Sequence, residues 1–499
     1  LPYLVEASVE SEELPDGNHR VRVRTVDAWA LSLGISFTVD EGFTFTGLSV
    51  NAKNLLGTGT QVGVFRNLWR ERQRIGVLGR QPNLFGTRID ATVHGGSTRS
   101  GDYITQALFR PYAGDFGKNA FRQAYHRRDD YFVYSVDPTM GFTQSYLRFE
   151  AELLELSYQR RFGSPTGLRF IAGVGVSREI VRFPFGDEGV RIVQNDDFDD
   201  PMPAPPGVID EVGIHANDHQ ASRINFTFGV RDISFLNLVG LDALRASQDV
   251  ESGLGLRVTV APGSESGGTA IDDILFRGEG ELGLAFGDFY MQFDADAHAR
   301  AVISDPRLDR TGWRDILYEL NANAYWDHSE RGQVFARAQL AGASRLDLPF
   351  QLTLGGRESV RGYNEDAYPG RQRLLLTLEE RLAMPALSTS FADVGIVGFI
   401  DAGQIWAGDV PFGVTPGWRA ALGAGLRIGL PAGAPNVLRI DFTAPLTGDR
   451  ETRGTVFRVY AELLGLLDRR AWPTQIERSR WFGVDPDLTT RPVNPLAGN

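Results

Sequence analysis

Arg361, Glu379 and Asp401 are the residues of this sequence whose types and positions point to chemistry by close contact. Arg361 lies in a glycine-rich segment that runs from Gly355 to Tyr363. Glu379 and Asp401 follow in two runs of alternating character, each on the polar parity of its run. A planar guanidinium can hold two carboxylates through bidentate, charge-assisted hydrogen bonds. The expected chemistry is therefore ion pairing and not bond breaking.

Catalytic and metal chemistry have no comparable signature. The seven histidines form no pattern with a serine or with paired acids, as a hydrolase would require. The chain has no cysteine, so it has no thiol nucleophile, disulfide or cysteine-bound zinc. The acidic stretch Asp196–Asp200 lacks the spacing and the glycine of an EF-hand. We expect no enzymatic activity, no metal site and no cofactor.

Alternation of apolar and polar residues is the pattern that must position these groups. Between residues 291 and 300, apolar residues such as Phe293 alternate with polar ones such as Asp294. Residues 223–231, 419–428 and 438–443 repeat the pattern. Period 2 is typical of a sheet with a different solvent on each face. Because nothing else in the chain supplies a core for the apolar parity, we expect it to face lipid.

A transmembrane β-barrel satisfies this requirement. A tilted strand crosses a bilayer in about 9–11 residues, roughly the length of these runs. An open sheet edge in lipid would leave backbone groups without partners, so the sheet must close. The apolar stretches, such as Val394–Ile400, are much shorter than the roughly 20 residues of a membrane-spanning helix. A net charge of −12 also argues against nucleic acid as a partner. The predicted fold class is all-β, an antiparallel up-and-down barrel.

Nineteen runs between Leu31 and Leu463 fit a strand. They are Leu31–Val39, Phe43–Lys53, Thr60–Arg66, Arg74–Leu78, Gly86–Gly95, Tyr103–Tyr112, Ser145–Gln159, Leu168–Val181, Arg223–Asp232, Ser252–Val260, Phe276–Phe286, Phe289–Val302, Leu317–Trp326, Val334–Gly342, Arg373–Leu382, Val394–Trp406, Trp418–Leu430, Val437–Leu446 and Val456–Leu463. The connection Pro184–Gln220 is rich in Asp, Pro and Gly and predicts a surface loop.

Four motifs resemble those of the BamA/TamA surface-antigen superfamily. Val360–Tyr363 reads Val-Arg-Gly-Tyr, and Phe399–Gly403 is similar to the family's Phe-x-Asp-x-Gly strand. Leu422–Leu446 resembles the family's terminal pattern, and Asn54–Gly59 resembles the turn after the second barrel strand. In family order they span about residues 28–464. One departure is that residues 465–499 continue beyond the expected closing strand.

The resemblance implies a bacterial outer-membrane barrel of sixteen strands, with an extracellular loop, Gly355–Arg371, folded into the lumen. Residues 1–27 resemble the last hairpin of a truncated periplasmic POTRA domain, residues 28–464 the barrel, and residues 465–499 form a periplasmic extension. Both termini are then periplasmic. The residues implied in the loop lock are Arg361, Gly362, Tyr363, Glu379, Phe399, Asp401 and Gly403; those of the periplasmic turn are Asn54, Gly57 and Gly59.

A weak seam between the first and last strands is also implied. Its residues are Leu31, Leu33, Ile35, Phe37 and Val39 in the first strand, with Phe457, Val459 and Ala461 in the last. An incompletely paired edge offers backbone partners to an incoming strand by β-augmentation. The sequence thus favours an outer-membrane protein assembly factor, whose partners are the bilayer, client barrel proteins and possible periplasmic or lipoprotein subunits. The alternatives are a two-partner-secretion exporter, a structural scaffold barrel and a passive pore.

Overall fold

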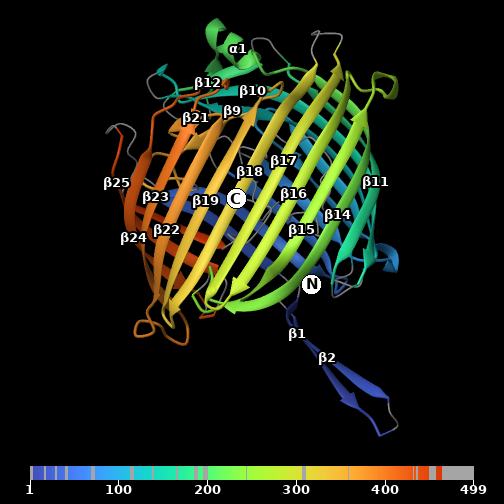
Figure 1. Ribbon diagram of the computed structural model, residues 1–499, viewed down its shortest axis with the longest axis vertical. Helices are drawn as coiled ribbons and strands as arrows, with labels where there is room; N and C mark the ends of the chain where they lie inside the picture. The colour runs from blue at the N-terminus through green and yellow to red at the C-terminus, as the bar shows by residue number, and fades with distance from the viewer. Residues whose placement is uncertain are drawn as a thin grey trace.

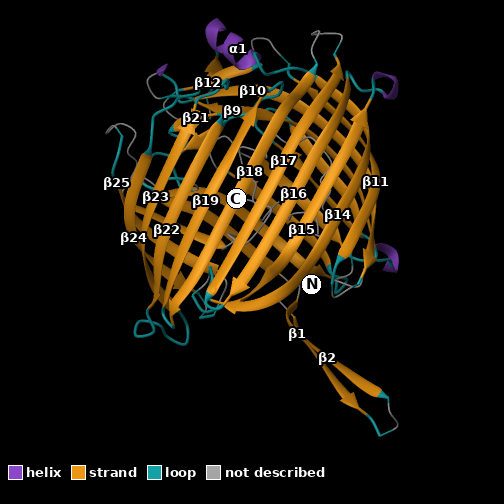
Figure 2. Ribbon diagram, viewed as in Figure 1, coloured by secondary structure: helices purple, strands orange, loops and turns teal. Residues whose placement is uncertain are grey.

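A closed antiparallel β-barrel forms the body of the computed structural model (Figures 1 and 2). The structure describes residues 4–15, 18–27, 31–39, 43–68, 74–112, 117–137, 140–164, 167–184, 189–194, 200–242, 244–305, 311–357, 359–430, 432–433, 436–448 and 457–463. Within these residues, no helix is long and apolar enough to cross a membrane.

Twenty long strands make the barrel wall in the described part of the chain. They are β3 (Leu31–Val39), β4 (Phe43–Leu55), β5 (Thr60–Asn67), β6 (Arg74–Gln81), β7 (Asp90–Ser97), β8 (Asp102–Arg110), β9 (Asn119–Ser135), β10 (Gln144–Gly163), β11 (Arg169–Arg182), β14 (His219–Val239), β15 (Ser247–Gly263), β16 (Asp272–Phe286), β17 (Phe289–Ser304), β18 (Gly312–Ser329), β19 (Gly332–Ser344), β22 (Gln372–Ala383), β23 (Asp393–Trp406), β24 (Arg419–Gly429), β25 (Asn436–Pro445) and β26 (Phe457–Leu463). Each pairs with its neighbour along the chain, and β26 meets β3.

The barrel is therefore the fold that the alternation predicted, but the strand number of sixteen is wrong. All nineteen runs marked in the sequence are strands, and β9 is the twentieth. The pattern missed β9 because five consecutive polar residues, His126–Asp130, interrupt its alternation. In the structure Asp129 accepts a hydrogen bond from Arg148, and Asp130 accepts one from Arg128. These ion pairs balance the charges of the two acids within the strand.

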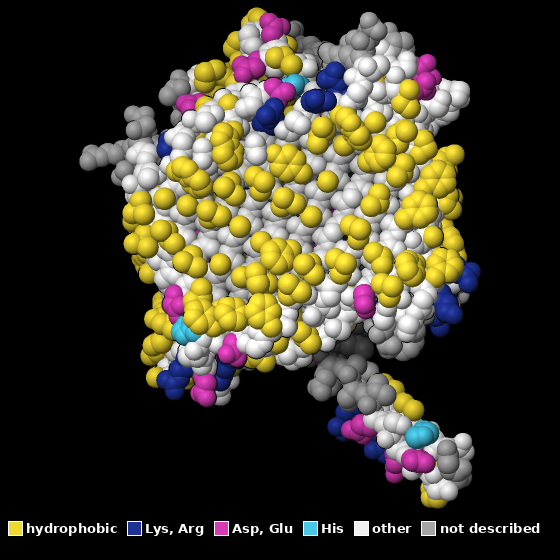
Figure 3. Space-filling model, in the orientation of Figure 1, with side chains coloured by type: hydrophobic (Ala, Val, Ile, Leu, Met, Phe, Trp, Pro, Cys, Tyr) yellow, Lys and Arg dark blue, Asp and Glu magenta, His cyan; other side chains and the backbone are white. Residues whose placement is uncertain are grey.

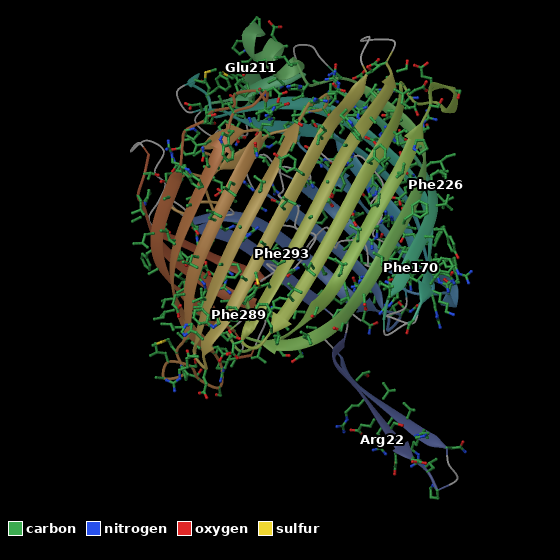
Figure 4. All side chains as sticks on the ribbon, viewed as in Figure 1. Arg22, Phe170, Glu211, Phe226, Phe289 and Phe293 are labelled. Atoms are coloured by element: carbon green, nitrogen blue, oxygen red, sulfur yellow. The ribbon has the colours of Figure 1, made fainter. Side chains whose placement is uncertain are left out.

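The outer surface carries the apolar parity of the strands. Ile224, Phe226 and Phe228 on β14 are 40–58% exposed, whereas Asn225 and Thr227 between them are buried. Figure 3 shows apolar side chains covering the middle of the barrel, with charged groups gathered at its two ends. Phe170, Phe226, Phe289 and Phe293 lie on this surface in Figure 4. The prediction that the apolar parity faces outward and the polar parity faces the lumen is confirmed.

The two ends of the barrel differ. A separate hairpin of β1 (Leu4–Glu13) and β2 (His19–Asp27) extends from one end, here named the lower rim after its place in Figure 1. Its strands pair only with each other in the described residues. The turns 55–60, 82–89 and 240–246 lie at this rim, because β4, β6 and β14 end there.

The opposite end, the upper rim, is covered by the described residues between 183 and 218, the upper-rim cap. The cap contains β12 (Val190–Val193), β13 (Met202–Pro203) and α1 (Pro206–Gly213), where the sequence predicted only a loop. Helix α1 begins with a proline in its first turn and buries Val208 and Val212, four residues apart, in an apolar cluster with Phe412. The short helix was missed because only this tertiary contact gives it a core.

Candidate functional site

The loop between β19 and β22 folds back into the lumen and carries Arg361. Its strands β20 (Leu352–Leu354) and β21 (Tyr368–Gly370) pair with each other as a small hairpin. Leu352, Leu354 and Val360 are fully buried in an apolar cluster that includes Leu375 of β22 and Ile405 of β23. The loop is therefore packed against the inner face of the wall over β22 and β23.

Arg361 is held by three carboxylates from three strands of the wall. Its Nε and Nη2 atoms lie 2.6 and 2.9 Å from the two oxygens of Asp401 on β23. Its Nη2 is also 2.9 Å from Glu379 on β22, and its Nη1 is 3.4 Å from Asp441 on β25. The guanidinium stacks 3.5 Å from the ring centre of Phe399. Arg361 is 6% exposed, so water weakens these ion pairs little.

The carboxylates are themselves fixed by a second set of donors. Thr377 donates to Asp401 at 3.0 Å, and Arg381 donates from Nε to Glu379 at 2.9 Å. Arg427 on β24 donates to Asp441 at 2.5 Å. A buried charge is tolerated when its partners satisfy it in this way. The result is a continuous network of three arginines and three acids, here named the lock network: Arg361, Arg381, Arg427, Glu379, Asp401 and Asp441.

Sequence reasoning named Arg361, Glu379 and Asp401, and the structure brings these three together. It missed Asp441, Arg427 and Arg381 as partners. Each of the three lies on the polar parity of its strand, which shows that it faces the lumen but not what it touches. These residues join the network because the loop reaches across four strands, β22 to β25.

Small residues let the loop approach the wall. A Cβ atom at Gly403 would lie 2.6 Å from Leu354 and 2.7 Å from Val360. Gly362 has a φ of +93°, which favours glycine, and a Cβ there would meet Thr443 at 2.9 Å. The hydroxyl of Tyr363 lies 2.8 Å from the carbonyl oxygen of Ala420 and 2.7 Å from that of Thr447, and can donate to either. All seven residues named for the lock thus lie at the loop–wall contact.

The junction of β26 with β3 has the shortest ladder of the wall in the described residues. One backbone pair, Val459 with Val39, is registered between them. By contrast, β25 pairs with β26 from Asn436 to Phe442, and β3 pairs with β4 along its whole length. Leu31 and Leu33 are each 64% exposed. The side chains named for the seam at Ile35, Phe37, Val39, Phe457, Val459 and Ala461 lie outside the described residues.

A family model decides the identity of this region. Residues 312–461, which run from β18 to β26 and contain the lock network, match the Omp85 superfamily domain. The chain carries an Omp85 superfamily domain. The superfamily inferred from the sequence motifs is thereby confirmed.

Solved structures similar to this chain come from three bacteria. They are BamA from Haemophilus ducreyi lacking POTRA domains 1–3 (12% identity, 92% of this chain, 76% of that chain, TM-score 0.42), CdiB from Escherichia coli (14%, 91%, 66%, 0.44) and CdiB from Acinetobacter baumannii (11%, 91%, 65%, 0.41). The chain thus spans about two thirds of each CdiB chain. No curated protein matches this sequence.

The lower-rim turn named from the sequence has a second copy in this barrel. In the turn 55–60, Asn54 accepts a hydrogen bond from the amide of Gly59 at 2.8 Å, and Gly57 and Gly59 have positive φ. Residues 83–87 read Asn-Leu-Phe-Gly-Thr, close to Asn-Leu-Leu-Gly-Thr at 54–58. Leu56 and Phe85 adopt the same left-handed conformation and are 92% and 94% exposed. The short repeat is visible in the sequence.

Metal and cofactor sites were not expected. In the part of the chain that the structure describes, no three His, Asp or Glu side chains are grouped as metal ligands.

Proposed function

We propose that this protein is an assembly factor of the bacterial outer membrane that inserts client β-strands at the junction of β3 and β26. The observation that carries the proposal is the single registered pair, Val459 with Val39, where other wall strands form long ladders. A client strand entering the bilayer has unpaired backbone groups, each costing several kcal/mol in lipid. A weakly paired edge supplies partners for them by β-augmentation.

The strands β5 to β8, which follow the junction on the β3 side of the wall, are also short, which supports entry on this side of the barrel. The strands β7 and β8 have 8 and 9 residues, whereas β10 and β14 have 20 and 21. At a tilt of about 40°, eight residues span roughly 20 Å along the membrane normal, against a hydrocarbon core of about 30 Å. A low wall favours local thinning of the bilayer, and a thinner bilayer presents a smaller barrier to an incoming strand.

The closed lumen favours this proposal over an exporter or a passive pore. The upper-rim cap is joined to two other loops, because His215 contacts the carbonyl oxygens of Leu346 and Asp409 at 3.0 and 2.5 Å. Below the cap, the loop that carries Arg361 occupies the lumen. A pore or exporter requires a continuous passage, whereas lateral insertion does not.

The remaining assignments follow from the same proposal. The lower rim faces the periplasm, and the β1–β2 hairpin is the end of a POTRA-like domain. The partners are the lipid bilayer, client barrel proteins and accessory subunits on the periplasmic side. The work is physical templating, and no catalytic group takes part in it.

A disulfide across the junction tests the proposal. Cysteines are introduced at Val39 and Val459, which is practical because the chain has none. The purified barrel is reconstituted into lipid vesicles, and the folding of a urea-unfolded small outer-membrane barrel is followed by protease protection. We expect oxidation to slow client folding towards the rate in empty vesicles, and reduction to restore it.

A second disulfide serves as the matched control. Leu426 and Ile440 are paired across the complete β24–β25 ladder, on the lipid-facing parity. A bridge between cysteines at these positions should leave client folding unchanged. If the Val39–Val459 bridge is equally harmless, the lateral-insertion proposal is wrong, and a scaffold role becomes the better explanation.

A further inference from the structure

The lower-rim turn 240–246 between β14 and β15, of which residues 240–242 and 244–246 are described, folds inward and contacts strands farther along the same wall. Leu241 and Asp242 are 2% and 8% exposed, although they lie in a turn at the end of the barrel. Leu241 packs with Tyr325 of β18 and Phe335 of β19. Turns at a barrel end normally face water. This turn instead covers part of the lower opening.

Polar contacts hold the turn along its length. Gln333 on β19 donates to the carbonyl oxygen of Gly240 at 3.2 Å, and Tyr325 donates to Asp242 at 3.0 Å. At the far end of the turn, Arg245 forms an ion pair with Asp393 on β23.

An apolar contact lies beside this ion pair. Leu244 occupies the space that a Cβ atom at Gly395 of β23 would fill. The turn therefore contacts β18, β19 and β23, so its position depends on several strands farther along the wall and not on β14 and β15 alone.

Arg381 on β22 links this turn to the lock network. Its Nη1 atom donates to the carbonyl oxygen of Leu241 at 2.6 Å and lies 3.5 Å from Asp242. Its Nε atom donates to Glu379 at 2.9 Å, and the other oxygen of Glu379 lies 2.9 Å from Arg361. One guanidinium thus bridges the lower-rim turn and the acid that holds the inward loop.

We propose that the turn 240–246 is a gate of the lower opening, and that Arg381 is a positioning residue that couples this gate to the inward loop. If the turn leaves, Arg381 loses its acceptors in the turn and no longer fixes Glu379 for Arg361. If Arg361 leaves, Glu379 draws Arg381 away from the turn. Coupling between two sites is reciprocal by thermodynamic necessity. The proposal goes beyond strand insertion and does not depend on the β3–β26 junction.

The test measures the accessibility of the inward loop while the turn is changed, and the accessibility of the turn while the loop is changed. Single cysteines at buried positions, Val360→Cys in the loop and Leu241→Cys in the turn, are labelled by a water-soluble maleimide on the folded chain in detergent micelles. We expect Asp242→Asn to raise the labelling rate of the cysteine at 360. We expect Arg361→Lys to raise the rate at 241. Typical coupling between sites corresponds to changes of roughly 5- to 150-fold.

The control variants separate coupling from general loosening. Asp249→Asn removes an exposed acid of β15 that bonds Asn237 and should change neither rate. In the Arg381→Lys background, which loses the forked donor, Asp242→Asn should no longer affect the cysteine at 360. If Asp242→Asn fails to fold, Arg245→Gln releases the other end of the turn and should raise the same rate. The coupling is disproved if folded variants of the turn leave labelling at 360 unchanged, or change it no more than Asp249→Asn.

Discussion

At the scale of single residues, Arg361 shows how a buried charge can specify a position. The guanidinium makes its shortest contacts with Asp401 and Glu379, both almost fully buried. Burial of a charge is costly, and the cost is offset only when geometry and hydrogen bonds are nearly ideal. The loop can satisfy these carboxylates only where Arg361 reaches all of them. The network therefore fixes the loop in one place more than it adds stability.

Replacement of Arg361 by alanine should release the loop. The buried acids Glu379, Asp401 and Asp441 would lose a shared partner, at a cost of about 3–5 kcal/mol in the free energy of unfolding. We expect a lower urea midpoint and new protease cleavage between Gly355 and Arg371. Arg371→Ala is the control, because its ion pair with Asp409 is exposed and contributes about 0–1 kcal/mol. Equal stability and protease resistance in both variants would contradict the lock.

At the scale of the strand, period 2 decides which solvent each side chain meets. Along β14, the outward residues Phe226 and Phe228 are exposed, whereas Asn225 and Thr227 between them are 3% and 5% exposed. Thr227 contacts Thr259 of β15 at 3.0 Å inside the barrel. The same strand thus meets lipid on one face and a polar lumen on the other.

A charge on the outer face of β14 should destabilise the barrel according to its depth. Phe228 lies near the middle of the strand and Ile224 nearer its upper end, on the same outward parity, and the two are similarly exposed, at 58% and 50%. We expect Phe228→Arg to cost about 2–4 kcal/mol in bilayers and Ile224→Arg, nearer the interface, about 0–1 kcal/mol. Denaturant titration in lipid vesicles measures both. Equal costs at the two depths would show that this face does not meet a bilayer.

At the scale of the whole molecule, the lumen is obstructed at three levels. The upper-rim cap lies over one end, the loop that carries Arg361 packs inside the lumen against β22 to β25, and the described residues of the turn 240–246 fold in at the other end. The cap is tied to the connection that carries Arg361, since His215 contacts the carbonyl oxygen of Leu346 at 3.0 Å, and Arg381 contacts both Glu379 of the lock network and the turn. The strands form the barrel wall, and the connections fold over its ends and into its lumen.

The purified barrel should conduct ions poorly. In planar bilayers we expect long silent periods with brief openings, because all three obstructions must move before a passage forms. Arg361→Ala should increase the frequency of openings, since it frees the middle obstruction. Large and steady conductance of the unaltered protein would contradict this prediction and favour a pore or an exporter.

The sequence by itself determined the strands and their sidedness, because period 2 is a local property that needs no knowledge of neighbours. It also placed Arg361, Glu379 and Asp401 together, through a family resemblance. The same resemblance implied sixteen strands, which is too few, because all nineteen alternating runs are strands in the structure. The number of strands is a property of the whole closed barrel. The count of alternating runs predicted it better than the family resemblance did.

Only the tertiary structure decided which lumen residues meet. Asp441, Arg427 and Arg381 joined the network, and Asp242 reached Arg381 from 139 positions earlier in the chain. Alternation shows that each of these side chains points inward. It carries no information on which inward groups share a depth and a side of the barrel, because that depends on strand tilt, register and the path of each loop.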